Sequence, residues 1–208
     1  MRSALGALLA VAMAVSSCAA TETPQSAVRR DDAISSPEVR KVVESALEQT
    51  RVTTGYTQEY VSLSYPGGDL PAHTGACTDV VIRAFRAVGV DLQKEVHEDM
   101  AKSFSAYPRK WGLKKPDRNI DHRRVPNLMT FFERRGRDVG ISADASAYLP
   151  GDVVAWDLGG GVTHIGIVTA EYDEASGRFL IVHNIGAGAR LEDVLFGWKV
   201  IGHYRYFR

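Results

Sequence analysis

The hydrophobic pattern of this chain changes once, near Pro150. Before this point apolar residues recur every three or four positions, which is the spacing of one face of an amphipathic helix. After it, short segments rich in β-branched and aromatic residues are separated by glycine-rich turns. Helices followed by a run of strands predict an α+β fold, with N-terminal helices packed on a C-terminal antiparallel β-meander.

The element boundaries have local signals as well. Ser36 is a typical N-cap and Pro37 a typical first helical residue, so a helix should start there. We expect three further helices, over residues 77–88, 91–103 and 125–135. We expect four strands, over residues 152–156, 163–170, 179–184 and 199–207.

The N-terminus predicts a lipid anchor. A short basic start precedes an apolar run of about a dozen residues, which is shorter than the roughly 20 needed to span a bilayer and fits a secretory signal. The sequence Val15-Ser16-Ser17-Cys18 resembles the bacterial lipobox, in which Cys18 is lipidated. The alternative is an ordinary cleaved signal with an incidental cysteine.

This reading divides the chain into three parts. Residues 1–17 are expected to be a lipoprotein signal peptide, 18–35 a flexible tether and 36–208 one domain. Ala19 is not the aspartate that retains lipoproteins in the inner membrane of Gram-negative bacteria. By that resemblance we expect a protein of the bacterial cell envelope, anchored through Cys18 in the outer membrane and facing the periplasm.

Charge and cysteine count narrow the possible partners. The 208 residues contain 25 Lys and Arg against 25 Asp and Glu, and this zero net charge argues against a nucleic-acid partner held by a global field. We expect a monomer without a metal or other cofactor. The chain has two cysteines, and if Cys18 carries lipid, Cys77 has no disulfide partner within the chain.

Cys77 is the candidate nucleophile. It stands where a helix should begin, and the positive end of a helix macrodipole can lower a thiol pKa from about 8.5 into the range of roughly 3.5 to 7.5. A nucleophilic thiol also needs a base and a group that orients the base. His164, on a predicted strand, is the candidate base, and His183 and Asn184, on the next strand, are candidates for the orienting group.

The expected hairpin between these strands supports this grouping. Its connection centres near Glu174, so His164 should lie opposite His183 or Asn184. Directly opposed residues have Cβ atoms roughly 4.5 to 5.5 Å apart. The strand pattern alone does not choose between the two partners.

The order of these motifs resembles the NlpC-type papain-like cysteine peptidases, which cleave bacterial cell walls. Tyr65 with two following glycines, Cys77 opening a helix, His164 on a strand and His183 on the next strand have that order. The resemblance implies a papain-like fold in which Cys77 is the nucleophile, His164 the base and His183 the orienting residue. It also implies that Tyr65 helps to form the substrate or oxyanion site.

A closer resemblance covers nearly the whole mature domain. Segments such as Tyr-Pro-Gly-Gly-Asp, Cys-Thr-Asp-Val-Val-Ile-Arg and Gly-Asp-Val-Val-Ala-Trp-Asp-Leu are similar to a bacterial family called a domain of unknown function, grouped with the papain-like superfamily. One departure from the peptidases is that they have Asp-Cys-Ser-Gly where this chain has Ala76-Cys77-Thr78-Asp79. Asp79 and Asn184 join Tyr65 as candidate substrate-binding residues.

Residues 109–138 form a locally basic segment, with ten Lys and Arg against four acidic residues. One hypothesis is an insertion that lines the active-site cleft, with Arg123 or Arg124 binding carboxylates of a peptide stem. The alternative is a solvated helix face and loop.

The sequence therefore predicts a thiol hydrolase of the cell envelope. The expected reaction is cleavage of an amide or peptide bond, with peptidoglycan peptide as the expected substrate. One alternative is an acyl- or peptidyl-transferase that uses the same cysteine and histidines. Another is a wall-binding lipoprotein without catalytic activity, in which Cys77 and both histidines are ordinary core residues.

Overall fold

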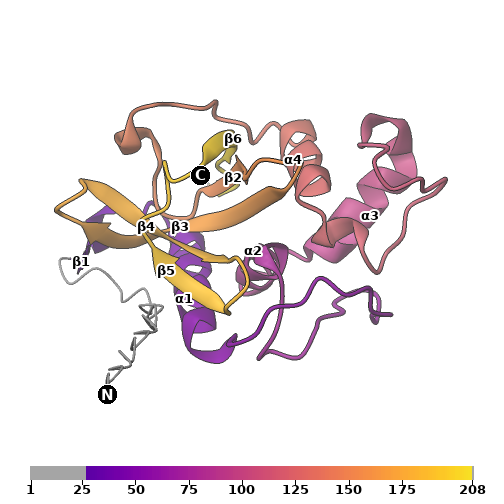
Figure 1. The fold of residues 1–208 in the computed structure, drawn as a ribbon, viewed down its shortest axis with the longest axis horizontal. Coiled ribbons are helices and arrows are strands. Elements are labelled where there is room, and N and C mark those ends of the chain that lie inside the picture. The colour runs from indigo at the N-terminus through magenta and orange to yellow at the C-terminus, as the bar shows by residue number, and fades with distance from the viewer. Residues whose placement is uncertain (1–26, 208) are drawn as a thin grey trace, which may run out of the picture.

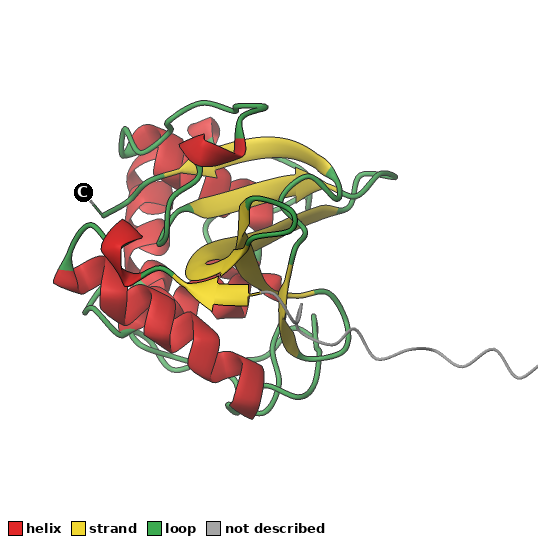
Figure 2. Cartoon of the chain, turned by 90° about the vertical axis from the view of Figure 1, so that its left-hand side faces the viewer, coloured by secondary structure: helices red, strands yellow, loops and turns green. Residues whose placement is uncertain are grey.

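The computed structural model describes residues 27–207, and within them the chain is an α+β protein. Figures 1 and 2 show the helices gathered beside one face of an antiparallel sheet. The α-helices are α1 (Pro37–Val52), α2 (Cys77–Arg86), α3 (Leu92–Ser103) and α4 (Val125–Arg134). The strands are β1 (Ala27–Arg29), β2 (Val153–Asp157), β3 (Thr163–Asp173), β4 (Arg178–Asn184), β5 (Ala189–Glu192) and β6 (Lys199–Tyr204).

The four predicted helices and four predicted strands are confirmed, with small differences at their ends. The hydroxyl of Ser36 accepts a hydrogen bond from the Val39 N–H and caps α1. The carboxylate of Asp91 caps α3 in the same way. The sequence did not predict β1 and β5.

The six strands are ordered β5-β4-β3-β2-β6, and β1 pairs with the far end of β3. Strand β2 pairs with β3 only as far as Ile167, whereas β3 continues to Asp173. The last residues of β3 therefore have an edge that β2 does not cover, and β1 pairs with them there. Ala27 pairs with Asp173 and Arg29 with Glu171 at this edge. The flexible tether predicted up to Ser35 is therefore wrong for residues 27–35, and the predictions for residues 1–17 and for Cys18 lie outside the described residues.

Alternation along β3 separates the two sides of the sheet. Ile165 and Ile167 belong to the core cluster that includes Cys77, Val81 and the aromatic side chains of α2 and α4. The other side carries a second cluster around Trp156. Residues of β3 adjacent in sequence therefore lie in different environments: Ile165 faces the cluster that contains Cys77, and His164 faces the side that carries Trp156.

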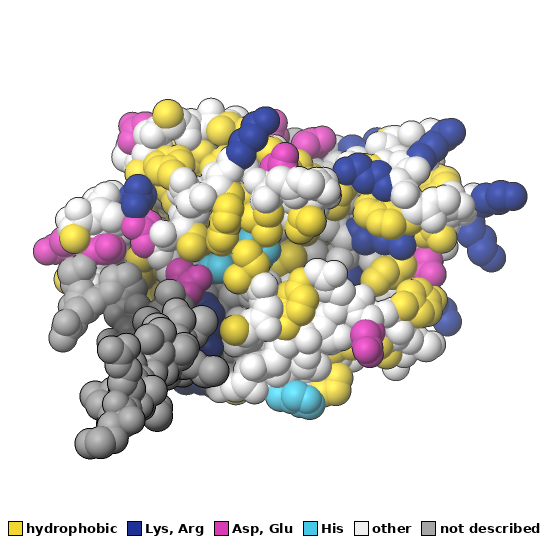
Figure 3. Space-filling model, viewed as in Figure 1, with side chains coloured by type: hydrophobic (Ala, Val, Ile, Leu, Met, Phe, Trp, Pro, Cys, Tyr) yellow, Lys and Arg dark blue, Asp and Glu magenta, His cyan; other side chains and the backbone are white. Residues whose placement is uncertain are grey.

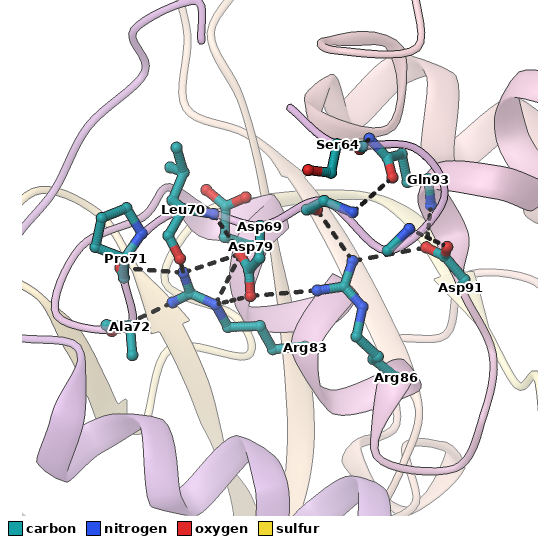
Figure 4. A network of polar contacts seen from close by, with 12 residues as sticks. Ser64, Asp69, Leu70, Pro71, Ala72, Asp79, Arg83, Arg86, Asp91 and Gln93 are labelled. Carbon is teal, nitrogen blue, oxygen red and sulfur yellow. Dashed lines mark hydrogen bonds and ion pairs between the residues drawn. The ribbon is translucent and has the colours of Figure 1, made fainter. Parts of the chain in front are cut away.

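The long loop between α1 and α2 is fixed to the helix that Cys77 begins. Arg83 of α2 forms an ion pair with Asp69 at 3.0 Å and donates to the carbonyl of Thr74 at 3.0 Å. Figure 4 shows Arg83 and Arg86 reaching from α2 into this loop, with Gln93 on its other side. The amide of Gln93 accepts from the Gly68 N–H at 2.9 Å. The chain segment that leads to Cys77 is thus held at several points.

No helix among residues 27–207 is both long and apolar enough to cross a membrane.

Candidate functional site

Cys77 is the first residue of α2 and one wall of a cavity of about 500 Å³. The side chain is 6% exposed. The helix start is held by Asp79, whose carboxylate accepts a hydrogen bond from the Ala76 N–H at 2.6 Å. The residues that line the cavity are Gln58, Tyr60, Ala76, Cys77, Thr78, Trp111, Ile120, Arg123, Arg124, Val125, Pro126, Gly161, Val162 and Thr163.

The electrostatic environment of the thiol differs from the one expected at a helix N-terminus. Burial raises the pKa of Cys77 to about 12. The backbone N–H groups of Ile165, Thr78 and Cys77 itself act in the opposite direction, because they stabilise a negative sulfur, but burial dominates. The expected lowering of the thiol pKa is wrong for this structure, so Cys77 is a neutral thiol near pH 7.

His164 and His183 are in direct contact. His164 Nε2 lies 2.9 Å from His183 Nδ1, and His183 Nε2 lies 2.8 Å from a carboxylate oxygen of Glu192. A carboxylate accepts, so His183 donates from Nε2 and its Nδ1 is then free to accept from His164. This assignment leaves Nδ1 of His164 with a lone pair, which is what a general base requires.

The strand register explains why these two side chains meet. Ile167 pairs with Val182, so the register is shifted by one residue from the predicted one, and His164 meets His183 across a diagonal. Gly166 lies between them in the sheet, and a Cβ at this position would stand 3.1 Å from His183 Cβ and 2.8 Å from Ile181 Cγ2. The absence of a side chain at Gly166 therefore lets β4 approach β3 where the histidines touch.

Two tryptophans enclose the pair of histidines. The ring centroid of Trp198 lies 5.6 Å from that of His164 and 5.9 Å from that of His183, and Trp156 lies 5.7 Å from His164. Burial, with a smaller contribution from the nearby His183, lowers the pKa of His164 to about 3. His164 is therefore neutral, and able to accept a proton, at physiological pH.

Cys77 lies near β3, but His164 projects to the side of the sheet that carries Trp156, whereas Ile165 faces the cluster that contains Cys77. Neither His164 nor His183 lines the cavity at Cys77. The N–H of Ile165, which directly follows His164, is directed at the Cys77 thiol. Among residues 27–207 no hydrogen bond joins the thiol to the imidazole, and catalytic hydrogen bonds are often long before substrate binds. The structure thus brings the predicted base and orienting residue into contact and sets the predicted nucleophile beside the same strand.

Comparison with known proteins places the chain in a family. The family model described as "Domain of unknown function (DUF1287)" matches residues 43–206. The chain belongs to the DUF1287 family. A relative in Escherichia coli (strain K12), named "Uncharacterized protein YijF", is 54% identical over 166 residues, which are 80% of this chain and 80% of that protein. No solved structure matches the chain.

The predicted membership in a family of unknown function is thereby confirmed, and the wider placement among NlpC-type peptidases stays a prediction. The match covers the core of the DUF1287 chain, from α1 to the end of β6. It therefore includes Cys77, His164, His183 and Glu192.

Asn184 does not orient His164. Its amide nitrogen donates to the carbonyls of Gly55 and Gly75, at 3.1 and 2.9 Å, and the side chain is fully buried. The reason is strand alternation, since Asn184 projects on the opposite side of β4 from His183. Asn184 instead ties β4 to the loop before Cys77, which also leaves its amide nitrogen no freedom to bind substrate.

Asp79 and Arg123 form a buried ion pair rather than a substrate site. Arg123 Nε lies 3.0 Å from Asp79 Oδ1, and the two side chains are 2% and 4% exposed. The remaining guanidinium nitrogens donate to the carbonyls of Glu59 and Thr57. Both the predicted carboxylate-binding role of Arg123 and its reading as a solvated charge are wrong, because every nitrogen of its head group is already paired inside the protein.

Of Arg123 and Arg124, Arg124 is the residue whose charged group remains accessible to the cavity. Its guanidinium carbon stands 4.1 Å from the centre of the Trp111 ring, and it contacts Asp121 at 3.4 Å. Trp111, Ile120 and Arg124 all come from the basic segment, so that segment does line the cavity at Cys77. Its predicted role in binding substrate carboxylates stays open for Arg124.

Tyr65 does not line the cavity beside Cys77. Its ring packs edge-on against His97, with ring centroids 5.3 Å apart. Tyr56 is the tyrosine near the thiol: burial raises the pKa of Tyr56, and the negative charges that Cys77 and Asp79 can carry raise it further. Tyr60 is the tyrosine that lines the cavity at Cys77. The spacing of twelve residues between Tyr65 and Cys77 did not place Tyr65 there, because the intervening loop folds back on α2.

Sequence reasoning missed Glu192, since the strand that carries it is only four residues long. The alternation in Ala189-Arg190-Leu191-Glu192 is the signal that could have found it. Among the described residues no group of three or more His, Cys, Asp and Glu side chains could hold a metal ion.

Proposed function

We propose that this protein is a thiol hydrolase of the bacterial cell envelope that cleaves an amide or peptide bond, with peptidoglycan peptide as its substrate. Cys77 is the nucleophile, His164 the general base and His183 the residue that orients the base. The observation that carries the proposal is the chain of contacts from Glu192 through His183 to His164, next to a cysteine that opens a helix at a cavity wall.

The hydrogen-bond chain supports a base role for one particular atom. With Glu192 and His183 as acceptors in turn, the proton of His164 is held on Nε2 and the lone pair is on Nδ1. A histidine that is buried only for packing does not need a chain of hydrogen bonds that ends at a carboxylate. A buried pair without a carboxylate at its end would also leave the tautomer of His164 undetermined.

The proposed reaction uses these protonation states, and it requires Nδ1 of His164 to come within hydrogen-bond distance of the Cys77 thiol when substrate binds. Sulfur of Cys77 attacks the carbonyl carbon as its proton passes to Nδ1 of His164, and the C–N bond then breaks as His164 returns the proton to the leaving amine. Water attacks the resulting thioester and releases the acid and the free thiol. The backbone N–H groups directed at the thiol are in the right region to stabilise negative charge during these steps.

The envelope location is part of the same proposal. Lipidation at Cys18 would anchor the domain in the outer membrane and bring the cavity to the cell wall from the periplasmic side. Metabolic labelling with an alkyne fatty acid should label the wild type and not a Cys18→Ser variant. Absence of label on the wild type would remove the anchor and leave the catalytic proposal in place.

A papain-like fold and the NlpC-type superfamily belong to the proposal too. The order of cysteine helix, histidine strand and second histidine strand supports them, and the α+β arrangement is compatible with them. A solved structure with substrate or inhibitor bonded to Cys77 would test both the fold assignment and the cavity.

Digestion of purified sacculi tests the activity directly. Wild type, Cys77→Ala and His164→Ala are incubated with sacculi, and the soluble products are analysed by mass spectrometry. Products that have gained one water in the wild type only would support hydrolysis, and products carrying a second acceptor group would indicate a transferase. Unchanged digestion by Cys77→Ala would exclude Cys77 as the nucleophile.

A further inference from the structure

A second and larger cavity, of about 670 Å³, lies beyond Tyr60 from the one at Cys77. Tyr60 lines both cavities. The residues that line the larger one are Tyr60, His97, Gly112, Leu113, Lys114, Lys115, Pro116, Asp117, Arg118 and Asn119. None of these belongs to the proposed catalytic group.

Three cations line this cavity without an anionic partner. Lys114, Lys115 and Arg118 are exposed, and none of them forms an ion pair within residues 27–207. Arg118 is directed over the ring of Tyr65, at 5.7 Å from its centre. Figure 3 shows Lys and Arg side chains gathered at the end of the molecule formed by α3 and the segment that follows it.

Asp117 is the one acidic residue among those that line this cavity, and both of its carboxylate oxygens already accept hydrogen bonds. Asp117 Oδ2 accepts a hydrogen bond from the Tyr60 hydroxyl at 3.1 Å, and its Oδ1 accepts from the Asn119 N–H at 2.9 Å. Asp117 therefore shapes the wall and offsets part of the positive charge without pairing with any of the three cations. The net charge of the lining stays positive.

The wall is fixed to the rest of the fold. The buried amide of Gln93 donates to the carbonyls of Arg118 and Ser64, at 3.1 and 2.9 Å. Asn119 Oδ1 accepts from the Leu63 N–H at 2.9 Å. These bonds hold the segment that carries the cations against the loop that precedes Cys77.

His97 contributes an aromatic side chain to the wall of this cavity. Its ring packs edge-on against that of Tyr65, with ring centroids 5.3 Å apart, and Arg118 lies over the same tyrosine ring. The wall therefore combines aromatic rings with unpaired positive charge.

We propose that this cavity is a subsite for a carboxylate of the substrate, so that the substrate class is an acidic peptide spanning Tyr60. This inference rests on the proposed function, because it places the scissile bond at Cys77. The exposed apolar surfaces of Tyr60 and Leu113 suit peptide side chains beside the charge. A carboxylate is the anion expected here, because the proposed substrate is a peptide and the acidic groups of peptides are carboxylates.

Peptide binding to the full-length protein tests the subsite apart from catalysis. A Cys77→Ala background prevents turnover, and two fluorescent peptides differ only in glutamate against glutamine. Adding Lys114→Gln, Lys115→Gln and Arg118→Gln together should weaken binding of the glutamate peptide about tenfold, since each exposed ionic contact contributes modestly. Binding of the glutamine peptide should change less than about twofold, the size of a weak uncharged contact.

A control triple variant removes the same number of positive charges from surface positions outside both cavities. Lys41→Gln, Arg51→Gln and Lys199→Gln neutralise three exposed cations that line neither cavity, and affinity for both peptides should persist. An equal effect of the two triple changes, or an equal loss for both peptides, would overturn the subsite. Stronger displacement of the glutamate peptide by inorganic phosphate than by glutarate would overturn the carboxylate assignment.

The two proposals fail in different ways. If the wild type digests neither sacculi nor the glutamate peptide but the binding difference persists, the subsite stands and the hydrolase proposal fails. If digestion depends on Cys77 but the glutamate preference is absent, the hydrolase stands and the subsite fails.

Discussion

Breaking the buried ion pair next to Cys77 should destabilise the fold strongly. Arg123 and Asp79 are 2% and 4% exposed and in contact at 3.0 and 3.1 Å. Replacing Arg123 by Met leaves the Asp79 carboxylate buried with the Ala76 N–H as its remaining partner. Breaking a buried pair in this way costs about 3 to 5 kcal/mol.

Two further losses keep the cost at the upper end. The carbonyls of Glu59 and Thr57 lose their donors from Arg123, at about 1 kcal/mol each for ordinary hydrogen bonds. The double variant Asp79→Asn with Arg123→Met removes the buried charge, and the oxygen of the new side-chain amide could still accept from the Ala76 N–H. We expect it to be more stable than Arg123→Met alone by about 1 to 3 kcal/mol, the usual penalty for a buried group left without its partner.

Urea unfolding followed by tryptophan fluorescence measures these free energies. Arg51→Met is the matched control, because Arg51 forms an exposed ion pair with Glu48 and its loss should cost less than about 1 kcal/mol. Costs of Asp79→Asn and Arg123→Met that simply add in the double variant would refute the reasoning. So would an Arg123→Met cost no larger than that of the control.

Three other perturbations have expected outcomes. Gly166→Ala should push β4 away from β3 and, with nearby atoms at 2.8 to 3.1 Å from the new Cβ, lower both the urea midpoint and any Cys77-dependent activity. Glu192→Gln should change the unfolding free energy by less than about 1 kcal/mol but reduce kcat by roughly tenfold or more, because an uncharged amide no longer fixes the His183 tautomer. An unchanged kcat would argue against the hydrogen-bonded chain from Glu192 through His183 to His164. Acid should destabilise the fold between about pH 6.5 and pH 3. Burial lowers the pKa of His122 and of His164 to about 3, so in this pH range the unfolded chain binds more protons than the folded one. The slope approaches roughly 1.4 kcal/mol per pH unit for each histidine, and urea midpoints across that range in wild type and His122→Leu should show a shallower decline in the variant.

The order of elements was predictable because its signals are local. The N-caps at Ser36 and Asp91 and the glycine at position 89, which has a φ of 81°, set helix ends through nearest-neighbour geometry. Strand β1 lacks such a signal, because three residues are too few for a period to be recognised, and the alternation in the four residues of β5 is a weak one. Their place in the sheet depends on an edge left free by other strands.

The candidate site also divides into features with local sequence signals and features that depend on distant segments. Cys77, His164 and His183 could be chosen from residue type and order, and the contact of the two histidines agrees with that choice. The roles of Asn184, Arg123 and Tyr65 could not, because each depends on where a loop distant in sequence returns to the helix or sheet. Arg123 in particular is a surface residue by composition and a buried one by its contacts with Asp79 and the loop before Cys77.

The protonation states set a constraint on any chemistry at Cys77. Burial raises the thiol pKa to about 12 and lowers that of His164 to about 3, so the neutral thiol and neutral imidazole are favoured before substrate binds. A preformed thiolate–imidazolium pair is therefore disfavoured in this state. If Cys77 is the nucleophile, proton transfer has to accompany formation of the carbon–sulfur bond, so that the negative charge develops on the substrate oxygen. A donor is then needed at that oxygen more than at sulfur. The backbone N–H groups of Cys77 and Thr78, which are directed at the thiol before substrate binds, would supply it by turning to the substrate oxygen, and the helix macrodipole acting on the thiol matters less.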